Sequence, residues 1–180
     1  MSVIKVNTIQ HANGTTALSF AANGQVTLAN TPLQLTGGQI VFPGTQSASA
    51  DGNTLDDYEE GTWTPTVTPS SGSLTAYGSS GIYVKVGRLV TITGTFILTT
   101  PGTASGSVSI GGIPFNATKP STAYRSALGV GREDGGTGFS YQAVLGGGSN
   151  TIFLGTASNG NITWTTNYEY IFTITYQTSA

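Results

Sequence analysis

The sequence contains no cysteine, and this absence excludes disulfide bonds, thiolate catalysis and cysteine-ligated metal together. It contains a single histidine, His11, so a Ser-His-Asp triad could only be built around that residue, in a segment without a core to hold it rigid. No apolar run approaches the roughly 20 residues that span a bilayer, so we expect no membrane insertion. The opening MSVIKVNTIQ lacks the apolar centre of a secretory signal, which predicts a mature N-terminus made in a cytoplasm.

Charge is also scarce. Only 8 % of the residues are charged, against roughly a quarter in a typical soluble protein. The net charge is −2 and the isoelectric point is near 5.1, whereas a nucleic-acid footprint needs clustered Lys and Arg. The six basic residues are scattered along the chain, so the sequence predicts no nucleic-acid partner and no polybasic membrane patch.

Helix signals are nearly absent, whereas strand signals are frequent. Glycine, with 26 positions, interrupts almost every window, and no apolar pattern holds a 3.6-residue period for more than a turn. Alternating β-branched and aromatic residues predict strands at 90–98, 106–110, 151–156, 161–166 and 168–178. In the last of these, Tyr168, Tyr170, Phe172, Ile174 and Tyr176 share one face, which we expect to face a core. The sequence therefore predicts an all-β fold.

The first 45 residues differ from the rest. The pattern A-N-G-x-x-x-L begins at Ala12 and recurs at Ala22, and Asn-Gly is a strong signal for a tight corner. It predicts short strands near 3–10, 15–20, 25–29, 33–36 and 39–42, with too few apolar residues in each to enclose a core within one copy. We therefore expect residues 1–45 to wrap around other copies of themselves. The predicted interface residues are Val3, Ile4, Val6, Ile9, Leu18, Phe20, Val26, Leu28, Leu33 and Leu35.

A small, polar linker at 46–54 precedes LDDYEEGTWTPTV, where Asp56, Asp57, Glu59 and Glu60 cluster before Trp63. A glycosidase pair would need two carboxyls about 5–9.5 Å apart across a cleft, whereas these acids are nearly consecutive. A calcium site suits the chemistry better, but the spacing and glycine of an EF-type loop are missing. The pattern favours a solvated joint that enters a head domain at 55–180, with no catalytic residue, metal or cofactor.

Two glycine stretches, 131–140 and 145–150, are followed by neither Lys-Ser/Thr nor a helix, so they do not predict a phosphate site. We interpret them as loop tips between strands. Within and beside the first stretch lie four residues that could contact a polar ligand such as a glycan: Arg132, Glu133, Asp134 and Tyr141. A plain connector is the alternative interpretation.

Two segments resemble bacteriophage structural proteins. VNTIQHANGTTALSFAANGQVTL is similar to the N-terminal segment of phage, particularly cyanophage, fibre and virion proteins. LDDYEEGTWTPTV, followed by GIYVKVGRLVTITGTF and GSVSIGGIPF, is similar to a module at the C-terminal ends of phage tail-fibre and tailspike-like proteins. Together the two resemblances cover residues 3–30 and 55–115.

The resemblance implies a homotrimer with an intertwined N-terminal β-stalk and a C-terminal antiparallel β-sandwich head, which we expect to be jelly-roll-like. It also implies a joint in which Tyr58 and Trp63 pack, Gly61 turns, Pro65 limits strand pairing and the carboxylates stay wet. The large β-helix that carries the activity of tailspikes is missing, so we expect no polysaccharide cleavage and no enzyme.

The expected function is therefore that of a virion protein, a short trimeric fibre or spike assembled in the host cytoplasm. Its partners would be itself, other virion proteins (tail, portal-proximal or capsid subunits) and a host surface glycan. The alternatives are a capsid decoration or cement protein, whose N-terminal strands would add to a capsid subunit, and a carbohydrate-binding module without a virion role.

Overall fold

The computed structural model of the chain divides into two compact units, Met1–Val41 and Phe42–Ala180, which are treated separately below. The predicted linker falls almost wholly outside the residues that the structure describes. These residues are 8–10, 12, 14, 16–20, 22, 26–28, 35, 37–45, 54–55, 57–118, 126–136, 138–146, 150–155 and 162–179. Strands form all of their regular secondary structure, and every pairing between strands is antiparallel, so the predicted all-β class is confirmed.

The first unit is a three-stranded antiparallel sheet made of β1 (Thr8–Gln10), β2 (Thr16–Phe20) and β3 (Val26–Leu28), in that order. These strands lie at three of the predicted positions, and each pairs antiparallel with the next strand in the chain. The strand predicted at 39–42 is wrong: these residues have no regular structure, and Ile40 and Val41 are exposed. At 33–36 only residue 35 is described, and it is not in a strand.

The second unit is one nine-stranded antiparallel sheet in the order β4-β6-β7-β12-β9-β10-β11-β8-β5. Its strands are β4 (Tyr58–Trp63), β5 (Thr66–Ser71), β6 (Ala76–Val86), β7 (Leu89–Thr100), β8 (Ser105–Gly111), β9 (Ala127–Asp134), β10 (Ser140–Leu145), β11 (Ile152–Gly155) and β12 (Glu169–Gln177).

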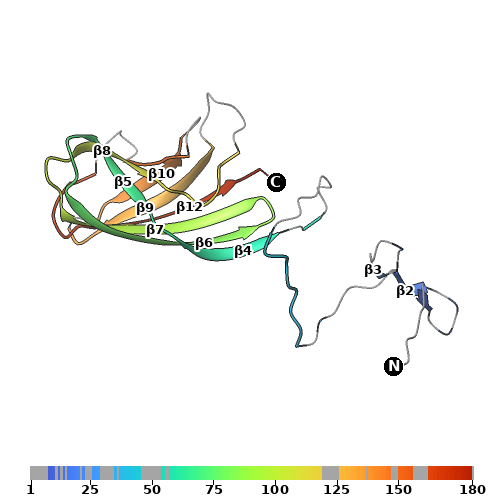
Figure 1. Cartoon of the computed structure of the whole chain (residues 1–180). Coiled ribbons are helices and arrows are strands. Elements are labelled where there is room, and N and C mark those ends of the chain that lie inside the picture. The colour runs from blue at the N-terminus through green and yellow to red at the C-terminus, as the bar shows by residue number, and fades with distance from the viewer. Residues whose placement is uncertain are drawn as a thin grey trace. The chain divides into compact units, whose positions relative to one another are not determined.

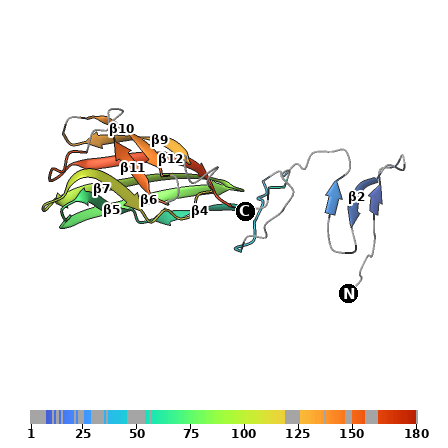
Figure 2. The same cartoon turned by 90° about the horizontal axis from the view of Figure 1, so that it is seen from above.

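The sheet is curled, because its two edge strands are neighbours in the chain. Only Thr64 and Pro65 separate β4 from β5, although these strands stand at opposite ends of the order. The Tyr77 hydroxyl of β6 accepts a hydrogen bond from the Val67 amide of β5, which brings the two ends together. In Figure 1 and Figure 2 the sheet folds over, and strands β9 to β12 lie as a second layer over β4 to β7 in the latter view.

The core lies inside this curl, because alternate side chains along each strand point inward. Strand β12 alternates strictly between exposed and buried residues, and the predicted aromatic face is the buried one. Phe96 of β7 stacks on Tyr170 with ring centroids 4.8 Å apart. The predicted strands at 90–98, 106–110 and 168–178 are confirmed as β7, β8 and β12.

Two of the sequence predictions for this unit are wrong. The described part of the stretch predicted as a strand at 161–166 has no strand, because its groups are used to close one end of the core. Ile162 is buried, and Trp164 donates its indole N–H to the Gly106 carbonyl. The glycine stretch at 131–140 is also not a loop throughout, since Gly131 to Asp134 continue strand β9.

Candidate functional site

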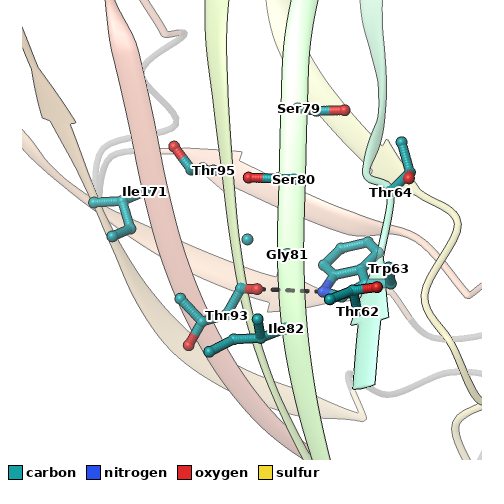
Figure 3. A pocket seen from close by; sticks show the side chains of 11 residues that line it. Thr62, Trp63, Thr64, Ser79, Ser80, Gly81, Ile82, Thr93, Thr95 and Ile171 are labelled. Carbon is teal, nitrogen blue, oxygen red and sulfur yellow. Dashed lines mark hydrogen bonds between the residues drawn. The ribbon is translucent and has the colours of Figure 1, made fainter.

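Trp63 lies in a slot made by two glycines. It stands opposite Gly81 of β6, and any Cβ placed at Gly81 would collide with the indole ring. A Cβ at Gly94 of β7 would lie 3.0 Å from the same ring and closer still to Phe172, which meets Trp63 edge-on at 6.2 Å. The indole N–H donates to the Thr93 carbonyl across β6, as Figure 3 shows. Trp63 therefore fastens β4 to the middle of the sheet.

A shallow hollow of about 420 Å³ lies beside this slot. Its wall is rich in Ser and Thr and includes two isoleucines, Ile82 and Ile171 (Figure 3). A second hollow, of about 510 Å³, lies on the other side of Ile171 and is lined in part by Val130 and Arg132. Ile171 and Thr93 belong to both hollows, so these two residues form a ridge between them.

The entrance to the second unit contains a buried ion pair. Lys85 of β6 is 2 % exposed and forms an ion pair with Asp57, which is also buried. The Lys85 ammonium group also lies 5.5 Å from the centre of the Phe115 ring. The prediction that all the carboxylates stay wet is wrong for Asp57. The reason is that β4 and β6 pair in antiparallel register, which points Asp57 and Lys85 to the same inner side.

The other two described acids of the entrance lie on opposite sides of β4, since neighbouring residues of a strand point to opposite faces. Glu59 accepts a hydrogen bond of 2.5 Å from the Tyr83 hydroxyl, and this bond raises the pKa of Tyr83 to about 12. Glu60 accepts one from Tyr58, which raises the pKa of that phenol. Asp56 lies outside the described residues. The carboxylates are thus divided between separate partners.

The predicted entrance residues are placed as follows. Trp63 and Pro65 are buried, while Tyr58 is exposed, with its ring 6.4 Å from that of Phe42. The prediction that Gly61 turns is wrong, since it lies within β4. A Cβ at Gly61 would meet the hydroxyl oxygen and the ring of Tyr83 at 2.8 to 2.9 Å, so a larger residue there would displace that side chain.

The four residues proposed for ligand contact do not share one surface. Arg132 and Asp134 are exposed on β9, whereas Glu133 and Tyr141 are buried. The expectation of an exposed loop fails for these two because the segment is a strand, and strand alternation turns Glu133 inward. The Gly138 amide donates to the Glu133 carboxylate, and burial raises the pKa of Tyr141, with the Glu133 charge adding to the effect.

The predicted interface residues of the first unit are described only in part. Ile9, Val26, Leu28 and Leu35 are exposed, and Leu18 is half-buried. Val3, Ile4, Val6 and Leu33 lie outside the described residues, and so does the side chain of Phe20. His11 also lies outside them.

The sequence reasoning missed Lys85 and the outward-facing apolar residues of β6. The signal was present in GIYVKVG, because strict alternation places Ile82, Val84 and Val86 on one face and Tyr83 and Lys85 on the other. Alternation alone does not say which of these faces is covered: in the structure Ile82 is 61 % exposed, while Lys85 is buried.

Comparison with protein-family models, with curated proteins and with solved structures found no match. Within the described part of the chain, no three His, Asp or Glu side chains gather as metal ligands would. The same residues include no helix long and apolar enough to cross a membrane. The fold and the site define an all-β, antiparallel protein, whose described residues form two sheets.

Proposed function

We propose that the protein is a non-enzymatic structural protein of a bacteriophage virion, a short homotrimeric fibre or spike. The first unit is proposed as the intertwined stalk that joins three copies, and the second as a jelly-roll-like head that faces outward, where it can contact the host surface. The sequence resemblance to phage fibre proteins supports this role. A capsid decoration protein, with the same two parts, is the alternative within the virion.

One observation carries the proposal: the apolar face of the three-stranded sheet. The register places Ile9 opposite Leu18 and Leu18 opposite Leu28, so one apolar row crosses all three strands. The neighbouring row of Thr8, Ser19 and Thr27 is polar and lies on the other face. Ile9 is 49 % exposed, and every residue of β1 and β3 is exposed.

A three-stranded sheet needs a covered apolar face to be stable in water. Here Ile9 is 49 % and Leu28 is 38 % exposed and Leu18 is half-buried, so covering the row would add part of the roughly 1.5–3 kcal/mol that full burial of each such side chain is worth. Copies that cover one another's rows would gain this free energy and would also protect the exposed edges of β1 and β3. Folding of this segment would then be coupled to assembly.

The experiment that tests the proposal is the solution mass of the full chain by light scattering, compared between two lysine variants of β3. Leu28→Lys places a charge in the apolar row, and we expect it to convert a trimer into monomers. Thr27→Lys, one residue away on the polar face, is the matched control and should stay trimeric. A monomeric unsubstituted chain, or equal masses for the two variants, would contradict the proposed stalk.

A further inference from the structure

The curled sheet has an outer face that is apolar where a solvated sheet is normally polar. We define the outer face by the aliphatic and threonine residues that are exposed or half-exposed on the outward side of four neighbouring strands; Ser80, Arg132, Asp134 and Glu169 lie on the same side but are not counted in it. The residues counted are Ile82, Val84 and Val86 of β6, Leu89, Thr91, Thr93, Thr95 and Ile97 of β7, Ile171, Thr173 and Thr175 of β12, and Leu128 and Val130 of β9. The centre is open to contact: Val130 is 65 % exposed and Ile171 is 46 % exposed.

In strand β6 the usual placement of side chains in a solvated sheet, apolar inward and charged outward, is reversed. Its valines and isoleucine point outward, while Lys85 is taken inside and needs Asp57 as a partner there. Burying an ion pair costs desolvation free energy that apolar residues in the same place would avoid. Covering the outer face would remove the exposed side chains of Ile82, Val84 and Val86 from water, which is favourable.

The threonines of the outer face are suited to a dry contact as well. Thr91 and Thr175 share a hydrogen bond of 2.9 Å, and Thr173 donates to the Ile92 carbonyl. Thr95 donates to the Glu169 carboxylate at 2.7 Å. Their hydroxyl groups are thus engaged within the sheet, so covering them would leave these groups satisfied. Threonine here contributes methyl groups to an otherwise aliphatic surface.

Charged residues border this face at one end and on β4. Arg132 stands opposite Ile171, Glu169 stands between Ile97 and Asp134, and Glu60 of β4 stands opposite Val84. An apolar centre depleted of charge inside a polar rim is the usual anatomy of a protein–protein interface. Interfaces between identical subunits have the most apolar centres of these.

The size of the face fits the centre of a subunit contact. It spans residues 82–86, 89–97, 171–175 and 128–130, about 22 positions, which at about 4.8 Å between strands and about 3.3 Å per residue give an area on the order of 350 Å² before the relief of the side chains is counted. A standard interface takes about 800 Å² from each partner. A contact between copies would therefore cover the whole face and extend over its rim.

We propose that the outer faces of neighbouring copies of this chain pack against one another, so that the heads as well as the stalks are in contact. This inference rests on the proposed assembly, because a stalk that joins the copies would hold the heads at a high effective concentration. The ridge of Ile171 and Thr93, with a hollow on each side, offers the relief that two such faces need to interlock.

The test uses full-length single-cysteine variants, which the cysteine-free chain makes unambiguous. Ile171→Cys and Val130→Cys report on the outer face, and Thr68→Cys, exposed on β5 in another part of the sheet, is the matched control. The rate of maleimide reaction is measured for each, together with the solution mass. We expect Cys at 171 and 130 to react about tenfold or more slowly than Cys at 68, because the contact must open first.

Each outcome decides the inference. An oligomer with slow reaction at positions 171 and 130 supports it. An oligomer in which all three thiols react at similar rates overturns it, leaves the proposed stalk intact and frees the face for another virion protein. A monomeric full chain with three fast thiols overturns both the stalk and the contact between heads.

Discussion

The two sheets of this protein follow the same alternation of apolar and polar side chains, yet only the larger one has a core. In the three-stranded unit the row of Ile9, Leu18 and Leu28 stays partly accessible, whereas in the nine-stranded unit the inward side chains of β7 and β12 are fully buried. The difference lies in the curl, which brings a second layer of the same sheet over the first. Alternation selects a face, and only a covering layer makes that face a core.

The largest expected effect is on the tryptophan that fastens the edge of the curl. Trp63→Ala should lower the free energy of unfolding by about 3–5 kcal/mol, since it removes a buried ring and leaves a cavity beside Phe172. Urea unfolding followed by tyrosine fluorescence measures this loss. Leu28→Ala in the first unit is the contrasting variant, and it should leave the unfolding transition of the larger sheet unchanged. A comparable loss from both would mean that the two units share one core.

A second loss is expected at the buried ion pair of the entrance. Lys85→Met should cost about 3 kcal/mol, because Asp57 would remain buried without its cation. The double variant with Asp57→Leu should recover most of this loss, since well-packed apolar residues can replace a buried pair. Thermal unfolding of both variants measures the coupling, and Glu60→Gln at the surface is the control. Additive losses would show that the two side chains act independently.

A smaller effect is expected from filling the glycine slot. Gly94→Ala should cost about 1–3 kcal/mol, because the added methyl group would press on the rings of Phe172 and Trp63. Gly78→Ala is the matched control in β6, where a Cβ meets only Ile97 at an ordinary 3.5 Å. The control should be neutral or slightly stabilising. Equal unfolding midpoints for the two alanine variants would contradict the close packing of the slot.

The smallest effect concerns the phenol at the entrance. Hydrogen bonding to Glu59 raises the pKa of Tyr83 to about 12, above the ordinary value of 10.0. The unfolded chain therefore loses this proton first, so the stabilisation is complete below about pH 10 and is lost as the pH rises towards about 12. Urea midpoints across this range should fall less steeply for Tyr83→Phe. Tyr176 contributes to the slope that remains in this variant, because burial raises the pKa of Tyr176 to about 12. If the midpoint falls equally steeply with pH in the unsubstituted chain and in Tyr83→Phe, then Tyr83 does not contribute to this pH dependence.

Much of the larger sheet could be predicted because its strands carry local signals. The alternating residues of β7 and β12 and the turn residues between strands are sufficient to place these elements. The wrong strand at 161–166 has equally good β-formers, but its described residues pair with no strand: Ile162 is buried, and Trp164 donates its indole N–H to the Gly106 carbonyl of β8. Strand propensity describes a fit to a sheet surface and depends on having a partner.

The position of the entrance could be predicted from the sequence, but the partners of its acidic side chains could not. The cluster of acids and Trp63 marked the beginning of a folded unit, yet Asp57 and Glu59 could only be assigned partners once the register of β4 against β6 was known. That register brings Lys85 and Tyr83 from more than twenty residues away. No pattern within the segment itself carries this information.

By itself, the sequence determined the class of the protein: an all-β chain with few charges, no cysteine and a distinct N-terminal segment of short strands. It determined these features because composition and alternation act locally, through backbone preference and side-chain direction. Only the tertiary structure decided which face of each strand is covered. The curl of the sheet turned Lys85 inward and left Ile82 and Ile171 outward, since burial depends on what lies opposite a residue in space and not on its neighbours in the chain.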